Sequence, residues 1–368
     1  MGGLQFKDIQ MKNTFILTVL FITSSAYAKF EYRPDWNVHK ACGKDSKQKK
    51  DYCLELIEIG SSSQNAKPIL LIPGFFQNAY IWDLLPEKGI SAARYLSKRW
   101  NLRPFVLHVR GIGNSDYVSN TNMDDIAMDD IEIAVNFLKK KSSDQVYIMG
   151  HSQGSITTQA YLAGLSKCIV ADCFNPAEAW SRQKKIKAVA LLAGNTAMSV
   201  DRDDNKLDEL ANMALFIRPA FRFFDEIDVK TLTRFTGPVS NLNLWQWLYN
   251  RHNTTKEARK ALYTKTVDST TNGILFQFAE GVRDRAIKTR SKLSYPAVLP
   301  LIRIPVFQQL YADDPLAESE ATLKDNFHRI GSSNKEYEVI QDRGHEDFFM
   351  NKGLHSDLDN VLHFLIKN

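Results

Sequence analysis

YIMGHSQGSI, residues 147–156, is the stretch on which the prediction of the fold rests. A short apolar run enters a Gly-His-Ser-Gln-Gly pentapeptide, and a helix-forming segment, SITTQAYLAGL, follows. The pentapeptide fits G-x-S-x-G, which is a weak signal alone, but strand, turn and helix form the setting of a nucleophilic serine. In such a strained turn the Ser152 hydroxyl projects from the sheet, and the flanking glycines avoid backbone clashes. The alternative is an ordinary serine at a strand-to-helix turn.

Apolar runs of the same kind alternate with helical stretches along much of the chain. Each run is continuous and aliphatic, which is typical of parallel strands covered on both faces. We therefore predict an α/β fold with a mostly parallel, doubly wound sheet and a closing helix over residues 356–366. The predicted strands lie in KPILLIPG (67–74), RPFVLHVRG (103–111), DQVYIMG (144–150), IKAVALLAG (186–194), IPVFQQLYADD (304–314) and KEYEVIQDRGH (335–345).

The alternation is interrupted over residues 199–300, which show no clear strand pattern. We expect one α/β core, residues 29–198 and 301–368, with a helical cap inserted between them. A separate second domain is less favoured because the core needs its last strands from beyond the insertion. Within it, ALFIRPAFRFF (214–224) fits either an interface-binding lid or a cap helix packed on the core, and LWQWLY (244–249) is a second aromatic stretch.

The N-terminal region carries the features of a secretory signal. From Met11 it reads MKNTFILTVLFITSSAYAKF, with a basic residue, an apolar run over residues 15–22 and a small-x-small site ending at Ala28. We predict a signal peptide over residues 1–28, with Met11 as an alternative start, and hence a secreted or periplasmic protein. The apolar run is short for a bilayer, so no transmembrane span is expected in the mature chain. A buried N-terminal helix is the alternative.

The four cysteines become informative if the protein is exported, because an even count in an oxidising compartment suggests disulfides. Pairing Cys42 with Cys53, and Cys168 with Cys173, closes the smaller loops. The two other connectivities and four free thiols remain open. No metal site is expected, because the sequence has neither a C-x-x-C pair nor H-E-x-x-H.

The charge pattern does not favour nucleic acid as a partner. The 368-residue chain has a formal net charge of +5, spread over short basic runs. A nucleic-acid-binding surface would need a dense basic stripe with interleaved aromatic residues, and the sequence has none.

A serine nucleophile needs a base and an acid that orients the base, and in this architecture they follow in the order Ser, Asp, His. LYADDPLA puts Asp313 and Asp314 just past one strand, and DRGHEDFF puts His345 in the loop after the next. We predict that His345 takes the Ser152 proton and that an aspartate fixes its tautomer. Asp314 is preferred because Pro315 biases the preceding residue towards extended backbone. None of the seven other histidines follows the serine at a strand end.

The tetrahedral intermediate also needs an oxyanion hole. One predicted donor is the backbone N–H of Gln153, directly after the nucleophile. The other is the N–H of Phe75, in the loop after the strand ILLIPG.

These segments together resemble the α/β-hydrolase superfamily, and within it the acid lipase group of gastric and lysosomal lipases and their microbial relatives. The resemblance implies a Ser152, Asp314, His345 triad, the oxyanion donors Phe75 and Gln153, and no cofactor. It departs from the group at Pro73, where a histidine is common, and the insertion matches only loosely, around residues 270–284. The matching segments are IPGFFQNAYIWDLLPEKGISAARYLSKRW (72–100), VRGIGNSD (109–116), the pentapeptide segment, DDPLA (313–317) and GHEDFF (344–349).

We therefore predict a secreted serine carboxylic-ester hydrolase of the lipase or esterase type, acting through an acyl-enzyme on a small-molecule or lipid ester. The cap is a candidate contact with a lipid–water interface. The alternatives are a polyester depolymerase or an amide hydrolase with the same triad, and a non-catalytic hydrolase-like binding protein. Epoxide hydrolases and haloalkane dehalogenases are disfavoured because they need an aspartate where Ser152 stands.

Overall fold

The part of the chain that can be described leaves out residues 1–29, which hold the predicted signal peptide, three pieces of the insertion and a few residues elsewhere. Those pieces hold the end of ALFIRPAFRFF and most of LWQWLY, so these predictions lie outside it. No helix in the described part is long and apolar enough to cross a membrane. The computed structural model describes residues 30–60, 63, 65–142, 144–169, 171–198, 206–219, 225–230, 248–351 and 353–368.

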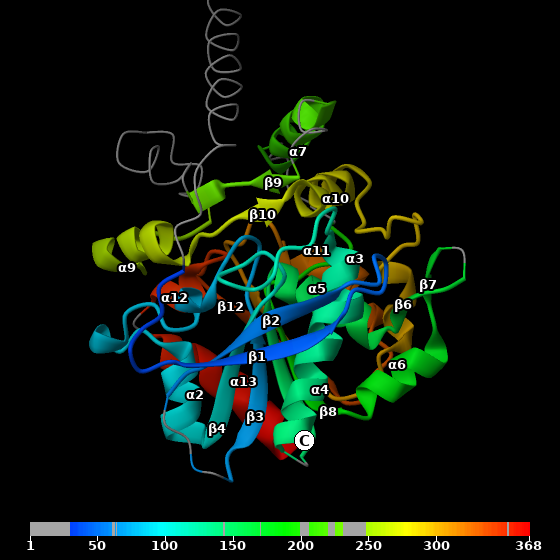
Figure 1. Cartoon of the computed structure of the whole chain (residues 1–368). Coiled ribbons are helices and arrows are strands. Elements are labelled where there is room, and N and C mark those ends of the chain that lie inside the picture. The colour runs from blue at the N-terminus through cyan, green and yellow to red at the C-terminus, as the bar shows by residue number, and fades with distance from the viewer. Residues whose placement is uncertain are drawn as a thin grey trace, which may run out of the picture.

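An eight-stranded sheet forms the centre of the molecule, in the order β1-β2-β4-β3-β5-β8-β11-β12 (Figure 1). Its six core strands pair in parallel with one another. Four fall within the predicted runs, and β4 and β5 each exceed theirs by one residue, so the prediction of an α/β fold with a mostly parallel sheet is confirmed. These strands are β3 (Lys67–Ile72), β4 (Leu102–His108), β5 (Val146–His151), β8 (Ile186–Leu192), β11 (Val306–Tyr311) and β12 (Lys335–Ile340).

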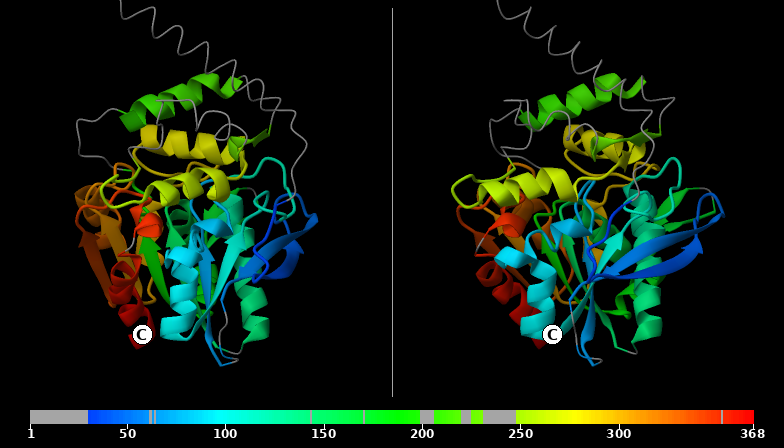
Figure 2. Two further views of the ribbon diagram at one scale, coloured as in Figure 1. Left: turned by 90° about the vertical axis from the view of Figure 1, so that its left-hand side faces the viewer. Right: turned by 60° about the vertical axis from the view of Figure 1, so that its left-hand side comes forward.

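Both faces of the sheet are covered, as the continuous apolar runs require. In β3, Ile69 and Leu71 pack in one hydrophobic cluster, whereas Leu70 and Ile72 pack in another on the opposite face. Successive side chains of a strand point to opposite faces, so a strand buried on both sides must be apolar at every position. The covering helices are α2 (Ala92–Trp100) and α13 (Leu354–Lys367) on one face and α4 (Ile131–Lys141) and α5 (Gln153–Leu162) on the other (Figure 2).

The helix before the serine turn begins at an Asn122 capping box, runs through α3 (Met123–Asp125) and the π-helical turn η4 (Ile126–Asp130), and continues as α4. The π-helical turn supports a buried ion pair. Arg110 is 2% exposed, and its Nε donates to Asp130 Oδ1 over 2.8 Å. Its backbone N–H donates to the other oxygen of Asp130 over 2.9 Å, so the loop after β4 is held against this helix.

Two strands at the sheet edge are not visible as a pattern in the sequence. β1 (Asn37–Lys44) and β2 (Asp51–Glu58) form an antiparallel hairpin, and β2 joins the sheet through β4. The sequence of β1 is NVHKACGK, which lacks an aliphatic run because this edge strand faces solvent over most of its length. Its pairing comes from β2, not from its own propensity.

The two disulfides have the connectivity that closes the smaller loops, which the sequence analysis favoured. Cys42 and Cys53 lie opposite each other in the hairpin and are bonded. Cys168 and Cys173 are bonded beside the antiparallel strands β6 (Leu165–Lys167) and β7 (Asp172–Phe174). None of the four cysteines is free, so the predicted pairing is confirmed.

The described part of the insertion lies over one end of the sheet (Figure 1). It contains helices, and two short segments, for which the sequence shows no clear strand pattern, also pair antiparallel. They were missed because two-residue strands carry no periodicity. The insertion contains α7 (Lys206–Ile217), β9 (Glu226–Ile227), α9 (Lys256–Ala261), η6 (Leu262–Thr266), β10 (Thr270–Thr271), α10 (Asn272–Arg283) and η7 (Pro296–Leu301).

Short helices complete the fold. They are η2 (Ala79–Ile81), η3 (Pro86–Lys88), α6 (Pro176–Gln183), α11 (Ser319–Asp325), η8 (Phe327–Arg329) and α12 (Asp347–Met350).

The hairpin disulfide is expected to stabilise the protein more than the second one. The two bonds join residues 11 and 5 positions apart. Loop closure then predicts a loss of about 3 kcal/mol in the free energy of unfolding for Cys42→Ser with Cys53→Ser, and about 2 kcal/mol for Cys168→Ser with Cys173→Ser. Urea unfolding of the two double variants measures both values. A larger loss for the second pair would contradict this assignment.

Candidate active site

Ser152 occupies a strained turn between β5 and α5. Its backbone has φ 52° and ψ −116°, a conformation that residues with a side chain rarely adopt. The turn is anchored on both sides: Ser152 N donates to Leu192 O over 2.9 Å, and Ser152 O accepts from Ile156 N over 3.1 Å. The strand, turn and helix that the sequence predicts around this serine are therefore present.

Two glycines allow the close approaches that the turn needs. A Cβ on Gly154 would lie 2.2 Å from the carbonyl oxygen of Ile72, so α5 could not start this close to β3 with a larger residue. A Cβ on Gly74 would lie 3.3 Å from Ser152 Cβ. The loop that follows β3 therefore passes directly beside the serine.

His345 and Asp314 form a buried pair. His345 Nδ1 lies 2.8 Å from Asp314 Oδ2, and the two residues are 2% and 0% exposed. The other carboxylate oxygen, Oδ1, accepts from the backbone N–H of Leu316 (2.8 Å) and Ala317 (3.1 Å). Asp313, the other candidate, is exposed to solvent. The structure thus joins His345 to Asp314 and holds that carboxylate in a single orientation.

The electrostatics of this pair suit a general base. Burial alone would lower the pKa of His345, but the charge of Asp314 and its hydrogen bond raise that pKa above the ordinary histidine value of 6.5. A carboxylate on Nδ1 also keeps the proton of neutral His345 on that nitrogen, which leaves Nε2 as an acceptor.

His345 is held next to the serine turn by the residue before the serine. His151 Nε2 donates to the backbone carbonyl of His345 over 3.0 Å, and the two rings lie 4.9 Å apart. The three predicted residues Ser152, Asp314 and His345 are thus brought to one region by the ends of β5, β11 and β12.

The loop that carries His345 also depends on the insertion. Asp347 accepts from the backbone N–H of Gly344 (3.0 Å) and of Asn250 (2.9 Å), and Glu346 N donates to Leu248 O (2.9 Å). Burial raises the pKa of Asp347 to about 6. Residues 248 and 250 therefore fix the histidine loop, a role that nothing in the sequence indicated.

The two predicted oxyanion donors lie on segments that flank Ser152. Phe75 follows Gly74 in a tight turn, in which Gln77 N donates to Gly74 O over 3.3 Å. Gln153 is the first residue of α5, and the first N–H groups of a helix have no partner within it.

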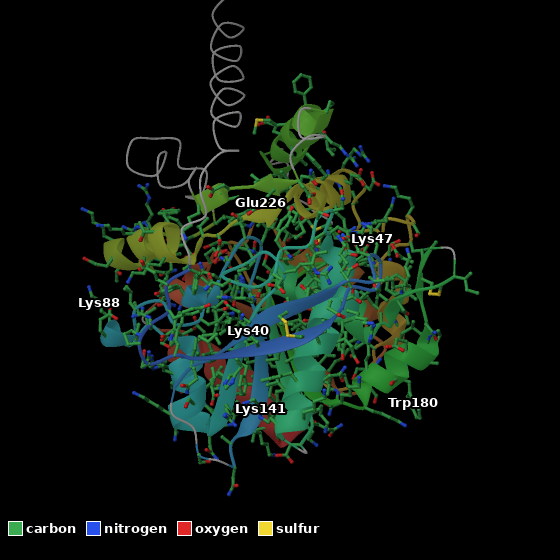
Figure 3. All side chains as sticks on the ribbon, in the orientation of Figure 1. Lys40, Lys47, Lys88, Lys141, Trp180 and Glu226 are labelled. Carbon is green, nitrogen blue, oxygen red and sulfur yellow. A yellow bond between two sulfur atoms is a disulfide. The ribbon has the colours of Figure 1, made fainter. Side chains whose placement is uncertain are left out.

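A cleft opens beside this site and is walled by both the core and the insertion. Burial raises the pKa of one residue of the insertion, Glu226, to about 7, while a hydrogen bond with Ser269 opposes the shift. Figure 3 labels Glu226 where the insertion meets the core. The lining combines aliphatic, aromatic and hydroxyl-bearing groups. It consists of Gly74, Phe76, Val109, Arg110, Gly111, Ile112, Tyr117, Gln153, Glu226, Ser269, Thr270, Thr271 and Ile274.

Three polar residues at the site were not predicted to have a role: Gln77, His151 and Glu346. Gln77 Nε2 donates to Glu346 Oε1 over 2.9 Å, although the residues are 269 positions apart. The only sequence signal was their position: Gln77 stands three residues after Gly74, His151 directly before Ser152 and Glu346 directly after His345.

His151, His345 and Glu346 are also a group in which metal-ligating atoms lie within 4.8 Å of one another. The hydrogen bonds of His345 Nδ1 to Asp314 and of His151 Nε2 to the His345 carbonyl make them part of the serine site instead.

Fold and site together define a class: a doubly wound α/β protein with a serine turn at the end of a central strand and a histidine–aspartate pair on later strands. A model of the alpha/beta hydrolase fold matches residues 67–352, which is more than half of the chain. The protein belongs to this family. No curated protein matches the sequence.

Several solved structures share the fold. A thermophilic esterase from Thermogutta terrifontis has a TM-score of 0.55 and 16% identity, over 89% of this chain and 99% of that one. A monoacylglycerol lipase from Paleococcus ferrophilus has a TM-score of 0.54 and 13% identity, over 85% and 98%. A membrane phospholipase A, described as a bacterial virulence factor, has a TM-score of 0.55 and 12% identity, over 99% and 94%. At these identities the likeness concerns the fold alone.

The strained turn predicts an unusual response to glycine. Ser152→Gly is expected to have a free energy of unfolding about 1 kcal/mol above that of Ser152→Ala, because glycine adopts positive φ without steric cost. In the regular part of α5, Ala160→Gly is expected to lower the free energy of unfolding by about 1 kcal/mol relative to wild type. Chemical denaturation of the variants measures both differences. A glycine variant at 152 that is less stable than the alanine variant would contradict the strained backbone.

Proposed function

We propose that the protein is a serine hydrolase that cleaves carboxylic esters through an acyl-enzyme. The observation that carries the proposal is the buried 2.8 Å contact between His345 and Asp314, held beside the strained turn of Ser152. Membership of the alpha/beta hydrolase fold family supports hydrolysis. The solved structures that share the fold include an esterase, a lipase and a phospholipase, which agrees with an ester as substrate.

In the proposed reaction, Ser152 Oγ attacks the ester carbonyl as His345 Nε2 takes its proton. The oxyanion accepts hydrogen bonds from the N–H groups of Phe75 and Gln153, and Asp314 stabilises the imidazolium. His345 then protonates the leaving alcohol. A water molecule, deprotonated by the same nitrogen, attacks the acyl-enzyme and restores Ser152 as the carboxylic acid leaves.

The proposal extends to substrate and location. Residues 199–300 act as a cap that shapes the acyl side of the site, with Phe76 and Ile274 as apolar walls of the cleft. Phe216 on α7 is 75% exposed and is a candidate contact with a lipid–water interface. The resemblance to acid lipases supports a lipid ester. The two disulfides, with the predicted signal peptide, support a secreted or periplasmic protein.

Ser152→Ala is expected to abolish labelling by a fluorophosphonate and to lower kcat for nitrophenyl esters about 10⁶-fold, because the nucleophile is lost. Ser356→Ala, which changes an exposed serine on α13, serves as the control and should label normally. A series of esters of increasing chain length, with triglycerides, distinguishes esterase from lipase.

Unchanged turnover in Ser152→Ala would disprove the proposal. Turnover of polyester films or aminoacyl amides without turnover of acyl esters would instead favour a polyester depolymerase or an amide hydrolase. No reaction with the probe would favour a binding protein.

The proposed base also predicts a pH dependence. Because the pKa of His345 is raised and the neutral form is the active one, kcat/KM should rise with pH through an apparent pKa above 6.5. Asp314→Asn removes the charge that raises this pKa, so the apparent pKa should fall and kcat should drop about 10⁴-fold. Asp313→Asn, its exposed neighbour, is the matched control. An equal loss in both variants would contradict the assignment of Asp314.

A further inference from the structure

A buried side-chain link joins the loop after β3 to the loop that carries His345. Gln77 Oε1 accepts from Gly74 N over 3.1 Å, and Gln77 Nε2 donates to Glu346 Oε1 over 2.9 Å. Gln77 is 6% exposed and Glu346 is 7% exposed. The link therefore runs from the turn of the proposed oxyanion donor Phe75 to the neighbour of the proposed base.

The tautomer of His151 follows from its partner. Its Nε2 faces the carbonyl oxygen of His345, which can only accept, so the proton of the neutral ring lies on Nε2 and Nδ1 is an acceptor. Burial, followed by the charge of His345, holds the pKa of His151 well below the ordinary value, so the ring stays neutral. Nδ1 is buried and has no hydrogen-bond partner within the described residues.

Glu346 has the complementary atom. Its Oε2 is also buried and, in the same described part of the chain, also lacks a hydrogen-bond partner. Burial raises the pKa of Glu346, which favours a neutral carboxyl with one O–H donor. One ligating atom of each of His151, His345 and Glu346 lies within 4.8 Å of the other two, so the Glu346 carboxyl is close enough to His151 for one bridging water to join the two orphan atoms.

The charges around Glu346 come from several elements. His345 favours its ionised form, whereas Asp314 and Asp347 oppose it. Tyr311, at the end of β11, also interacts electrostatically with Glu346. An ionised Glu346 would face two other acids and the lone pair of His151 Nδ1, and it would have no proton to donate to that nitrogen.

We propose that Glu346 is a positioning residue whose neutral carboxyl accepts from Gln77 and donates through one water molecule to His151 Nδ1, and so ties the oxyanion turn and the histidine loop to the serine turn. This inference rests on the proposed function. The inference adds to the proposed function because it assigns to Glu346 a proton that holds the geometry of the site and is not transferred in the reaction. Ionisation of Glu346 at alkaline pH removes the donor and loosens the oxyanion turn, so kcat falls.

The test compares Glu346→Gln with Glu346→Leu over a pH series. Glutamine supplies both the acceptor and the donor at every pH, so kcat should match wild type at neutral pH and should lose the alkaline decline. Leucine supplies neither, so kcat should fall about tenfold with little change in KM. Glu336→Gln, an exposed glutamate on β12, is the control and should keep the wild-type profile.

An alkaline decline that persists in Glu346→Gln would overturn the inference, and so would wild-type turnover in Glu346→Leu. If the leucine variant does not fold, the glutamine profile still decides. An infrared difference spectrum of wild type minus Glu346→Gln at neutral pH should contain the C=O stretch of a protonated carboxyl. A carboxylate band in its place would refute the inference that Glu346 is neutral. The spectrum requires no enzymatic activity. If the wild-type protein reacted with neither esters nor the fluorophosphonate, only the proposed function would be disproved, and the spectrum would still test the role of Glu346.

Discussion

The backbone of Ser152 is the constraint on which the rest of the site depends. A non-glycine residue at φ 52° persists only where its surroundings over-determine it. Here β5 pairs with β3 on one side and β8 on the other, and Gly154 lets α5 start against the carbonyl of Ile72. The strained turn thus belongs to the centre of the sheet, where a buried core resists its relaxation.

Around that turn, burial of polar groups organises the site. Asp314, His345 and Asp347 are nearly inaccessible to water, and each is held by hydrogen bonds from the protein. A buried polar group without a partner is costly, so such partners restrict each side chain to one orientation. Part of this support comes from Asn250, so the insertion contributes to the geometry of the site and does more than cover it.

Much of the fold could be predicted because its central strands are buried on both faces and carry unbroken aliphatic runs. That Ser152, Asp314 and His345 lie in one region could be predicted because residues at the carboxyl ends of parallel strands meet at one edge of the sheet. The edge strand β1 could not, because a polar strand exposed over most of its length lacks a distinctive pattern. Nor could the pair Gln77 and Glu346, whose contact spans 269 positions and exists only after the sheet has assembled.

The sequence by itself determined the class of fold and the candidate nucleophile, since both depend on local pattern. It favoured the pairing of the cysteines that closes short loops, and the structure decided it. Only the tertiary structure decided which aspartate meets His345, because Asp313 and Asp314 differ by a single position and their exposure is set by packing. It also decided that Leu248 and Asn250 of the insertion anchor the histidine loop and that Glu346 lies against Gln77. These contacts join segments far apart in the chain, and they form only when the core excludes water from their polar atoms.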